Sequence, residues 1–279
     1  MILSYHPCFE GDKSLLCAGR EPGADDLAAI KAADAVILPQ GCRQSLYEMA
    51  HSNCTNVFPN FDARFNYPGK IGQARLFKEK RVAHPKTEIF LNLDAFSTHY
   101  VGFPEKPNPD FPFVFKFDWG GEGEQVYLIQ SSSEFQSVLQ TAGSFEKSGH
   151  TGFVLQEYIP SQNRSLRVVV IGQTITSYWR IQENAHRFGT HLAKGAVIDA
   201  ESDPELQAVV MSSVKDFCIL TGINLAGFDI LISQENKALF FLEINYYFGR
   251  RGLGGSEKFY ETLIVEIKKW IDSLGLKRQ

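Results

Sequence analysis

Two carboxylates and one amide near the C-terminus could together bind a divalent cation. The segments 227–233 and 238–245 are apolar, alternate in the manner of strands and flank a polar turn, which is typical of a β-hairpin. If the hairpin closes symmetrically, Asp229 lies opposite Glu243, and the two-residue period puts Asn245 on the face of Glu243. Uncompensated like charges are costly to bury. These oxygen ligands suit Mg²⁺, which fills its remaining positions with water and phosphate.

A solvated hairpin is the simpler interpretation of the same residues. Acidic residues on hairpins are usually exposed, and an Asn after a strand usually belongs to a turn. The two-residue period also places Phe241 on the face of Glu243, so the acid would share that face with a large apolar side chain. The sequence by itself leaves both interpretations open.

A lysine beside a glycine-rich loop forms a second candidate site. Lys116 lies in the aromatic and β-branched run 111–117, which predicts a buried strand. Glycine lets backbone N–H groups approach anionic oxygens and lysine supplies positive charge, so the pair suits phosphate binding. The pattern is neither a Walker A loop nor a Rossmann fingerprint, and a plain glycine turn is the alternative. The loop glycines are Gly120, Gly121 and Gly123.

The composition excludes several classes of function. The chain has 279 residues, of which 44% are hydrophobic and 22% charged, with a net charge of -4 and a pI near 6.0. This balance gives no electrostatic reason to bind nucleic acid or an anionic membrane, and no apolar run approaches a membrane span. The N-terminus lacks a signal-peptide pattern, so we expect a cytoplasmic protein. The five cysteines are odd in number and never form C-x-x-C, which predicts reduced thiols.

The chain divides into an α/β beginning and a longer remainder. The first part alternates strand-like and helix-like segments, which predicts a small parallel sheet. Pro68 and Gly69 interrupt the periodicity, and a helix from Lys70 must end before Pro85. Amphipathic helices are predicted over 204–222 and 257–275. The predicted domains are residues 1–68, 69–155 and 156–279.

The order of these pieces resembles the ATP-grasp superfamily, in particular the branch of ribosomal-protein glutamate ligases, glutathione synthetases and D-alanine ligases. The resemblance covers about residues 70–245. Lys70 resembles the lysine that opens a helix ahead of a proline turn, and Lys116 resembles the lysine before the flexible glycine loop. The other matches are an adenine-binding linker at Gln156, Glu157, Tyr158 and Ile159, a strand arginine at Arg167, a basic residue at Lys194, and metal ligands at Asp229, Glu243 and Asn245.

The resemblance implies an α+β ATP-grasp fold, in which two subdomains clasp ATP behind the small N-terminal domain. It implies ATP with Mg²⁺, or Mn²⁺ in its place, and ligation of a carboxylate to an amine or thiol through an acylphosphate. Lys70 and Lys116 would supply positive charge while the loop excludes water. Arg180 would orient the γ-phosphate or the acylphosphate, and Lys194 and Arg250 complete the expected catalytic set. The expected partners are a small-molecule or peptide carboxylate and an amine, and a homo-oligomer is compatible with this interpretation.

Three positions depart from the family pattern. The segment 160–165 contains no acid to contact the ribose, and His191 stands where many relatives carry asparagine. After Asn245, relatives often continue with small residues, proline and glycine, whereas residues 246–252 are aromatic, glycine and two adjacent arginines. The arginines indicate either an acidic substrate or a solvated basic turn.

Three functions therefore remain open. The first is an ATP-dependent ligase, which the full set of lysines and metal ligands favours. The second is a small-molecule kinase on the same fold, in which a hydroxyl accepts the γ-phosphate. The third is a nucleotide-binding regulatory protein without turnover, which the departures favour and the retained metal ligands oppose.

Overall fold

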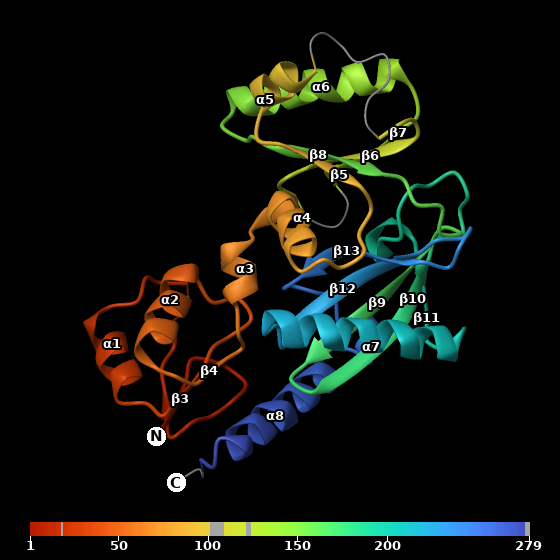
Figure 1. Ribbon diagram of the computed structural model, residues 1–279. Coiled ribbons are helices and arrows are strands. Elements are labelled where there is room, and N and C mark those ends of the chain that lie inside the picture. Colours follow the sequence, from red (N-terminus) through yellow and green to blue (C-terminus); the bar gives the residue numbers. More distant parts are fainter. Residues whose placement is uncertain (18, 101–108, 121–123, 277–279) are drawn as a thin grey trace.

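Three sheets follow one another along the chain, as the computed structural model shows for residues 1–17, 19–100, 109–120 and 124–276 (Figure 1). No helix within these ranges is long and apolar enough to cross a membrane. The three predicted domains stay a prediction, and β8 (Phe153–Glu157) of the second sheet crosses the limit predicted between residues 155 and 156.

The N-terminal sheet is small and entirely parallel, as the alternation of strand-like and helix-like segments predicts. Its strand order is β2-β1-β3-β4, and every neighbouring pair is parallel. Buried and mostly aliphatic residues fill its two central strands, β1 and β3, so helices cover these strands as parallel sheets require, whereas the edge strand β2 is exposed. The elements are β1 (Ile2–Ser4), β2 (Lys13–Ser14), α1 (Ala24–Lys31), β3 (Ala35–Ile37), α2 (Gln44–Asn53), β4 (Val57–Phe58) and α3 (Asp62–Asn66).

The central lobe is an antiparallel sheet with two helices on one face (Figure 1). The predicted buried strand is confirmed over Phe113–Phe117, and its alternation assigns the two faces. Phe113, Phe115 and Phe117 pack beneath the helices, while Lys116 points to the other side. The strand order is β5-β8-β6-β7. The elements are β5 (Thr87–Phe90), α5 (Leu93–His99), β6 (Phe113–Phe117), β7 (Val126–Ile129), α6 (Ser132–Lys147) and β8 (Phe153–Glu157).

The C-terminal lobe is a five-stranded antiparallel sheet in the order β11-β10-β9-β12-β13. Val168 and Val170 pack with α7, and Val169 and Ile171 pack with α8, so the two helices cover opposite faces. The expected amphipathic helices are confirmed. The elements are β9 (Arg164–Ile171), β10 (Thr174–Ile181), η1 (Leu192–Lys194), β11 (Val197–Asp199), α7 (Pro204–Thr221), β12 (Leu225–Ile232), β13 (Leu239–Asn245), η2 (Arg251–Leu253) and α8 (Ser256–Ser273).

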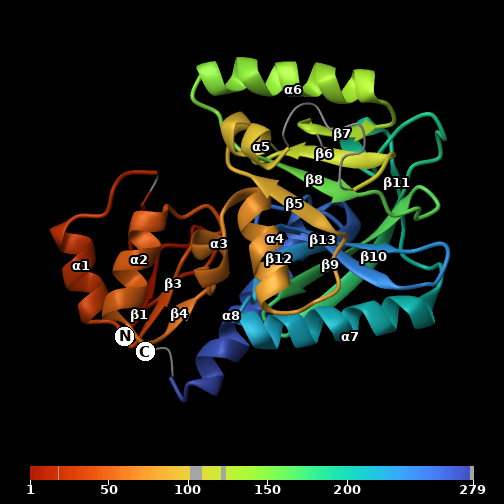
Figure 2. The ribbon, with the colours of Figure 1, turned by 45° about the horizontal axis from the view of Figure 1, so that its top comes forward.

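Helix α4 (Gly69–Glu79) lies between the central sheet and β13 (Figures 1 and 2). Its first turn receives a cap from the central lobe, because the Ile71 N–H donates to Asp118 Oδ1 at 2.7 Å. One turn later it contacts the C-terminal lobe through Gln73. The N-terminal domain also packs on the C-terminal lobe, where the rings of Phe58 and Trp270 lie 5.5 Å apart. The C-terminal lobe thus contacts both α4 and the N-terminal domain.

Candidate functional site

The β12–β13 hairpin pairs Asp229 with Glu243 and Gly227 with Asn245. This confirms the predicted opposition of the two carboxylates. The register shifts after Asp229, so that Ile230 pairs with Phe241 and one residue of β13 bulges out. The bulge reverses the faces, because Phe241 now shares the face of Ile230 and packs against α7. The prediction that Phe241 shares the face of Glu243 is therefore wrong.

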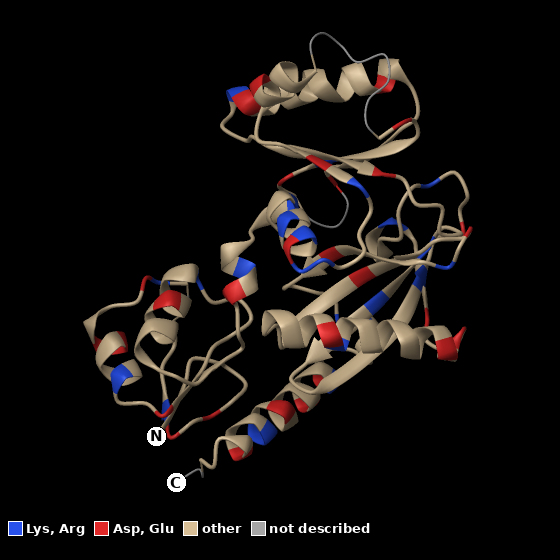
Figure 3. Cartoon of the chain, in the orientation of Figure 1, with Lys and Arg blue, Asp and Glu red and all other residues tan. Residues whose placement is uncertain are grey.

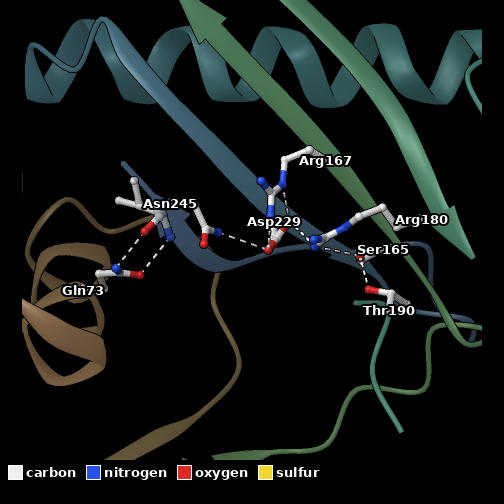
Figure 4. Close-up of polar contacts among 8 residues, drawn as sticks. Gln73, Ser165, Arg167, Arg180, Thr190, Asp229 and Asn245 are labelled. Atoms are coloured by element: carbon white, nitrogen blue, oxygen red, sulfur yellow. Dashed lines mark hydrogen bonds and ion pairs between the residues drawn. The ribbon is translucent and has the colours of Figure 1, made fainter. Parts of the chain in front are cut away.

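Asp229 is held by two arginines and one amide (Figure 4). Arg167 donates from Nε to Oδ1 at 2.7 Å and from Nη2 to Oδ2 at 3.0 Å. Arg180 forms an ion pair with Oδ1, and Asn245 donates from Nδ2 to Oδ2 at 3.2 Å. Each carboxylate oxygen thus accepts two contacts, which matches its hydrogen-bonding capacity.

This arrangement compensates the buried charge of Asp229 without a metal ion. The Asp229 side chain is 4% exposed, and those of Arg167 and Arg180 are 7% and 8% exposed. Burial alone would raise the pKa of Asp229, but the two arginines hold it well below its ordinary value. The cost of burying the Asp229 carboxylate, which suggested a cation, is therefore compensated by Arg167 and Arg180.

Glu243 and Asn245 keep open oxygens that fit a divalent cation. In the part of the chain that the structure describes, no hydrogen bond or ion pair reaches the Glu243 carboxylate, and Asn245 uses only its amide nitrogen. Carboxylate and amide oxygens are suitable ligands for Mg²⁺. Asp229 fits the same ion only by giving up one of its present partners. The donor set thus suits a cation held chiefly by Glu243 and Asn245.

Two lysines supply positive charge beside Glu243. Burial lowers the pKa of Lys116 to about 8, and the Glu243 charge partly opposes this shift. Burial also lowers the pKa of Lys70, with Glu243 and Asp118 acting in the opposite sense. Lys70 Nζ donates to the carbonyl oxygens of Trp119 and Gly120 at 3.1 and 3.3 Å, so it contacts the start of the glycine loop. Figure 3 shows Lys and Arg on α4 and on strands of the C-terminal sheet.

A cavity, called the apolar cavity below, lies between the central and C-terminal lobes. The linker residues 156–159 form part of its wall together with Lys116, Asp229 and Glu243. Gln156 Nε2 donates to Thr87 Oγ1 at 2.9 Å, whereas its buried Oε1 has no partner among the described residues. Much of the wall is apolar: Tyr158 and Ile159 of the linker are joined there by Val114, Val126, Phe188, Leu231 and Leu242.

A second cavity, called the arginine-rich cavity below, is lined by Arg167, Arg180, Arg250 and Arg251 among other residues. Its wall includes Arg250, whose guanidinium lies 4.4 Å from the ring centres of both Phe259 and Tyr260. Burial, assisted by the Arg180 charge, lowers the pKa of His191 to about 4, so this imidazole is neutral near pH 7. Four residues line both cavities: Arg180, His191, Asp229 and Glu243.

The profile of the RimK-like ATP-grasp domain matches residues 70–271 of the sequence. The chain belongs to the RimK-like ATP-grasp family. Membership confirms the expected ATP-grasp fold and places the chain among ATP-dependent ligases at the level of the family. No curated protein matches the sequence significantly.

Solved structures of the ATP-grasp fold superpose on most of the chain. An ATP-grasp RimK domain protein from Sphaerobacter thermophilus is 12% identical over 95% of this chain and 98% of its own, with a TM-score of 0.61. An L-amino acid ligase from Bacillus licheniformis is 12% identical over 100% of this chain and 70% of its own, with a TM-score of 0.61. An ADP complex of purK, an N5-carboxyaminoimidazole ribonucleotide synthetase, is 11% identical over 90% of this chain, which spans 64% of purK, with a TM-score of 0.58. These likenesses concern the fold alone.

The structure brings most of the residues predicted from the ATP-grasp resemblance around the two cavities, whereas Lys70 lines a smaller pocket with Lys116 and Glu243, and Gly120 lines neither cavity. Gly121 and Gly123 lie outside the described residues, and Gly120 has a left-handed φ of 85°. Lys194 lines a different opening, beside Arg187 and the edge strand β7, rather than the wall around Asp229. Its assignment, like that of the other site residues, stays a prediction.

Sequence reasoning missed several residues that line or brace the site. Phe188 and Thr190 lie in an irregular segment after β10, where no periodicity marks a binding residue. Tyr247 lines the arginine-rich cavity, and its hydroxyl accepts a hydrogen bond from Arg64 at 3.0 Å. Gln73 could have been noticed, because it follows Lys70 by three residues on a helix and so shares its face.

Proposed function

We propose that the protein is an ATP- and Mg²⁺-dependent ligase that joins a carboxylate to an amine through an acylphosphate. The observation that carries the proposal is the position of Glu243. This carboxylate lines the apolar cavity, the arginine-rich cavity and a smaller pocket that Lys70 and Lys116 also line. From this position Glu243 could hold a cation beside the γ-phosphate, while a substrate approaches from the arginine-rich cavity.

The apolar cavity suits the adenine base. Its flat aromatic and aliphatic lining can enclose a purine, and the unpartnered Gln156 Oε1 can accept a hydrogen bond from an exocyclic amino group. Lys116 and Lys70 would then contact the phosphates, which recovers part of the energy spent on burying their charge. Because the missing acid after the linker leaves the ribose contact open, Ser161 and Asn163 at the cavity wall are its candidates.

Glu243 and Asn245 would hold the cation. When bound, Mg²⁺ would supply positive charge that offsets the negative charge developing during phosphoryl transfer. Asp229 acts differently, since it fixes the direction of Arg167 and Arg180. Arg180 lies between the two cavities with an unpartnered, buried Nε among the described residues, and is therefore suited to orient the transferred phosphate.

The arginine-rich cavity would take the substrates. Its lining contains Arg167, Arg180, Arg250 and Arg251, whereas its acids are Asp229 and Glu243, of which Asp229 is already paired. This excess of positive charge favours an anionic substrate. In the reaction, a carboxylate oxygen attacks the γ-phosphorus and ADP leaves. The amine nitrogen then attacks the acyl carbon, the C–O bond to phosphate breaks, and the nitrogen loses a proton.

A screen of acidic carboxylates and amines for ADP release tests the proposal. ADP formation should require Mg²⁺, a carboxylate and an amine together, and ¹⁸O from the labelled carboxylate should appear in the released phosphate. A matched control is Glu243→Gln, which should fold and lose the turnover. ADP release without ¹⁸O transfer would indicate a kinase. Tight ATP binding with no turnover across the whole panel would indicate a regulatory protein.

A further inference from the structure

A glutamine side chain forms hydrogen bonds with the backbone at the outer edge of β13, where a further strand could otherwise pair. β13 is the last strand of its sheet, so one side of its backbone has no neighbouring strand. At Ile244 that side is occupied by the side-chain amide of Gln73 of α4. Gln73 Nε2 donates to the Ile244 carbonyl at 2.8 Å, and the Ile244 N–H donates to Gln73 Oε1 at 2.8 Å. The amide thus imitates one rung of a β-ladder.

The two Gln73–Ile244 hydrogen bonds lie next to the candidate cation ligands. Ile244 lies directly between Glu243 and Asn245, whose open oxygens fit a cation. The bulge between the pairs of Asp229 and Ile230 interrupts the ladder on the other side of the strand. A bulge leaves local pairing less constrained, so a second support at Ile244 determines where the neighbouring side chains point.

The same helix also contacts the phosphate-binding elements of the central lobe. Lys70 precedes Gln73 by one turn and reaches the Trp119 carbonyl at 3.1 Å, while the Ile71 N–H binds Asp118 at 2.7 Å. Helix α4 is therefore fixed to the start of the glycine loop at one end of this turn and to β13 at the other. A short helical segment of this kind is stiff, because backbone hydrogen bonds close each turn.

We propose that Gln73 is a positioning residue, which sets Glu243 and Asn245 at a fixed distance from Lys70 and from Gly120 at the start of the glycine loop. The inference rests on the proposed function, in which these two residues hold the cation and the lysines hold the phosphates. Gln73 itself touches neither ligand in this role. By joining α4 to β13, Gln73 fixes the cation ligands relative to the lysine that contacts the phosphates. Pre-organisation of this kind strengthens the binding of a metal–nucleotide complex.

Mn²⁺ titrations of the protein–ADP complex, followed by electron paramagnetic resonance, test this role. Gln73→Met keeps the length of the side chain and removes both bonds, and Gln73→Ala removes the side chain as well. In both variants the Mn²⁺ affinity of the ADP complex should fall about tenfold, as expected when two modest hydrogen bonds no longer support the ligands. ADP affinity measured without metal should change less than twofold, because the apolar cavity is untouched.

Gln207→Met is the matched control. Gln207 also bonds backbone carbonyls through its amide, at 3.1 Å to Ala200 and 2.9 Å to Ser202, but it lies on α7 away from the cavities. This variant should lose thermal stability while its Mn²⁺ affinity stays at the wild-type value. Wild-type Mn²⁺ affinity in both Gln73 variants would overturn the positioning role and leave the proposed function intact. Absence of any Mn²⁺–ADP complex in the wild type would instead overturn the proposed function, and with it the role of Gln73.

Discussion

Replacing Asp229 by asparagine tests whether this carboxylate is the anchor of an arginine pair. The variant preserves shape but leaves Arg167 and Arg180 buried without their counter-ion, at side-chain exposures of 7% and 8%. Breaking a buried ion pair by removing one partner costs about 3–5 kcal/mol. We therefore expect Asp229→Asn to lower the free energy of unfolding by this amount. The melting temperature should fall by about 6–20 °C, from a shift of about 2–4 °C per kcal/mol in a domain of this size.

Urea unfolding without nucleotide or metal measures the effect directly, and Glu243→Gln is the matched control. Glu243 is half-buried, lacks a hydrogen-bond partner among the described residues and acts on Lys70 and Lys116 only through space, so its variant should cost about 1 kcal/mol or less. Adding Arg180→Met to Asp229→Asn should recover part of the loss, because it removes one uncompensated charge. An Asp229→Asn protein as stable as Glu243→Gln would refute the reasoning, since the carboxylate would then not be needed to keep the arginines buried.

Three further changes test other parts of the structure. Lys116→Met should keep or raise the free energy of unfolding, because burial disfavours the ammonium, while ADP affinity measured by calorimetry falls at least tenfold. Burial alone would raise the pKa of Glu266, but Lys269 and the β9–β10 turn hold it below the ordinary 4.5. The stability advantage of the wild type over Glu266→Gln, about 2 kcal/mol in urea, should therefore be full above pH 4.5 and shrink as the pH falls below it. Gly72→Ala should cost about 1–3 kcal/mol in thermal unfolding, as its Cβ would meet the Tyr67 carbonyl carbon at 2.3 Å.

The order of the elements could be predicted from the sequence because each has a local signal. The run 111–117 is aromatic and β-branched, and Pro68 and Pro85 bracket a helix that the structure places at Gly69–Glu79. The one-residue bulge in β13 left no such signal. Its apolar residues fit either face equally well, and the choice depends on which of them α7 covers.

The candidate site shows the same division between local and tertiary information. The opposition of Asp229 and Glu243 follows from the near symmetry of a short hairpin, which the sequence displays. The compensation of Asp229 does not, because Arg167 and Arg180 lie 62 and 49 residues before it and reach it only through the pairing of β9 with β10 and β12. A charge argument from sequence can state that a buried acid needs a partner. It cannot choose between a cation and an arginine on a neighbouring strand.

The arginine pair gives the site a property that a metal triad would lack. With Asp229 paired, two buried guanidinium groups share one carboxylate, and Lys116 adds a further buried cation on the facing lobe. Folding leaves this positive charge only partly compensated, and a buried cation costs free energy until an anion arrives. A polyphosphate with its cation bound at Glu243 and Asn245 would supply negative charge where the lysines and Arg180 converge. The electrostatic strain of the ligand-free site would thus become binding energy for the nucleotide, with Asp229 keeping the arginines directed toward it.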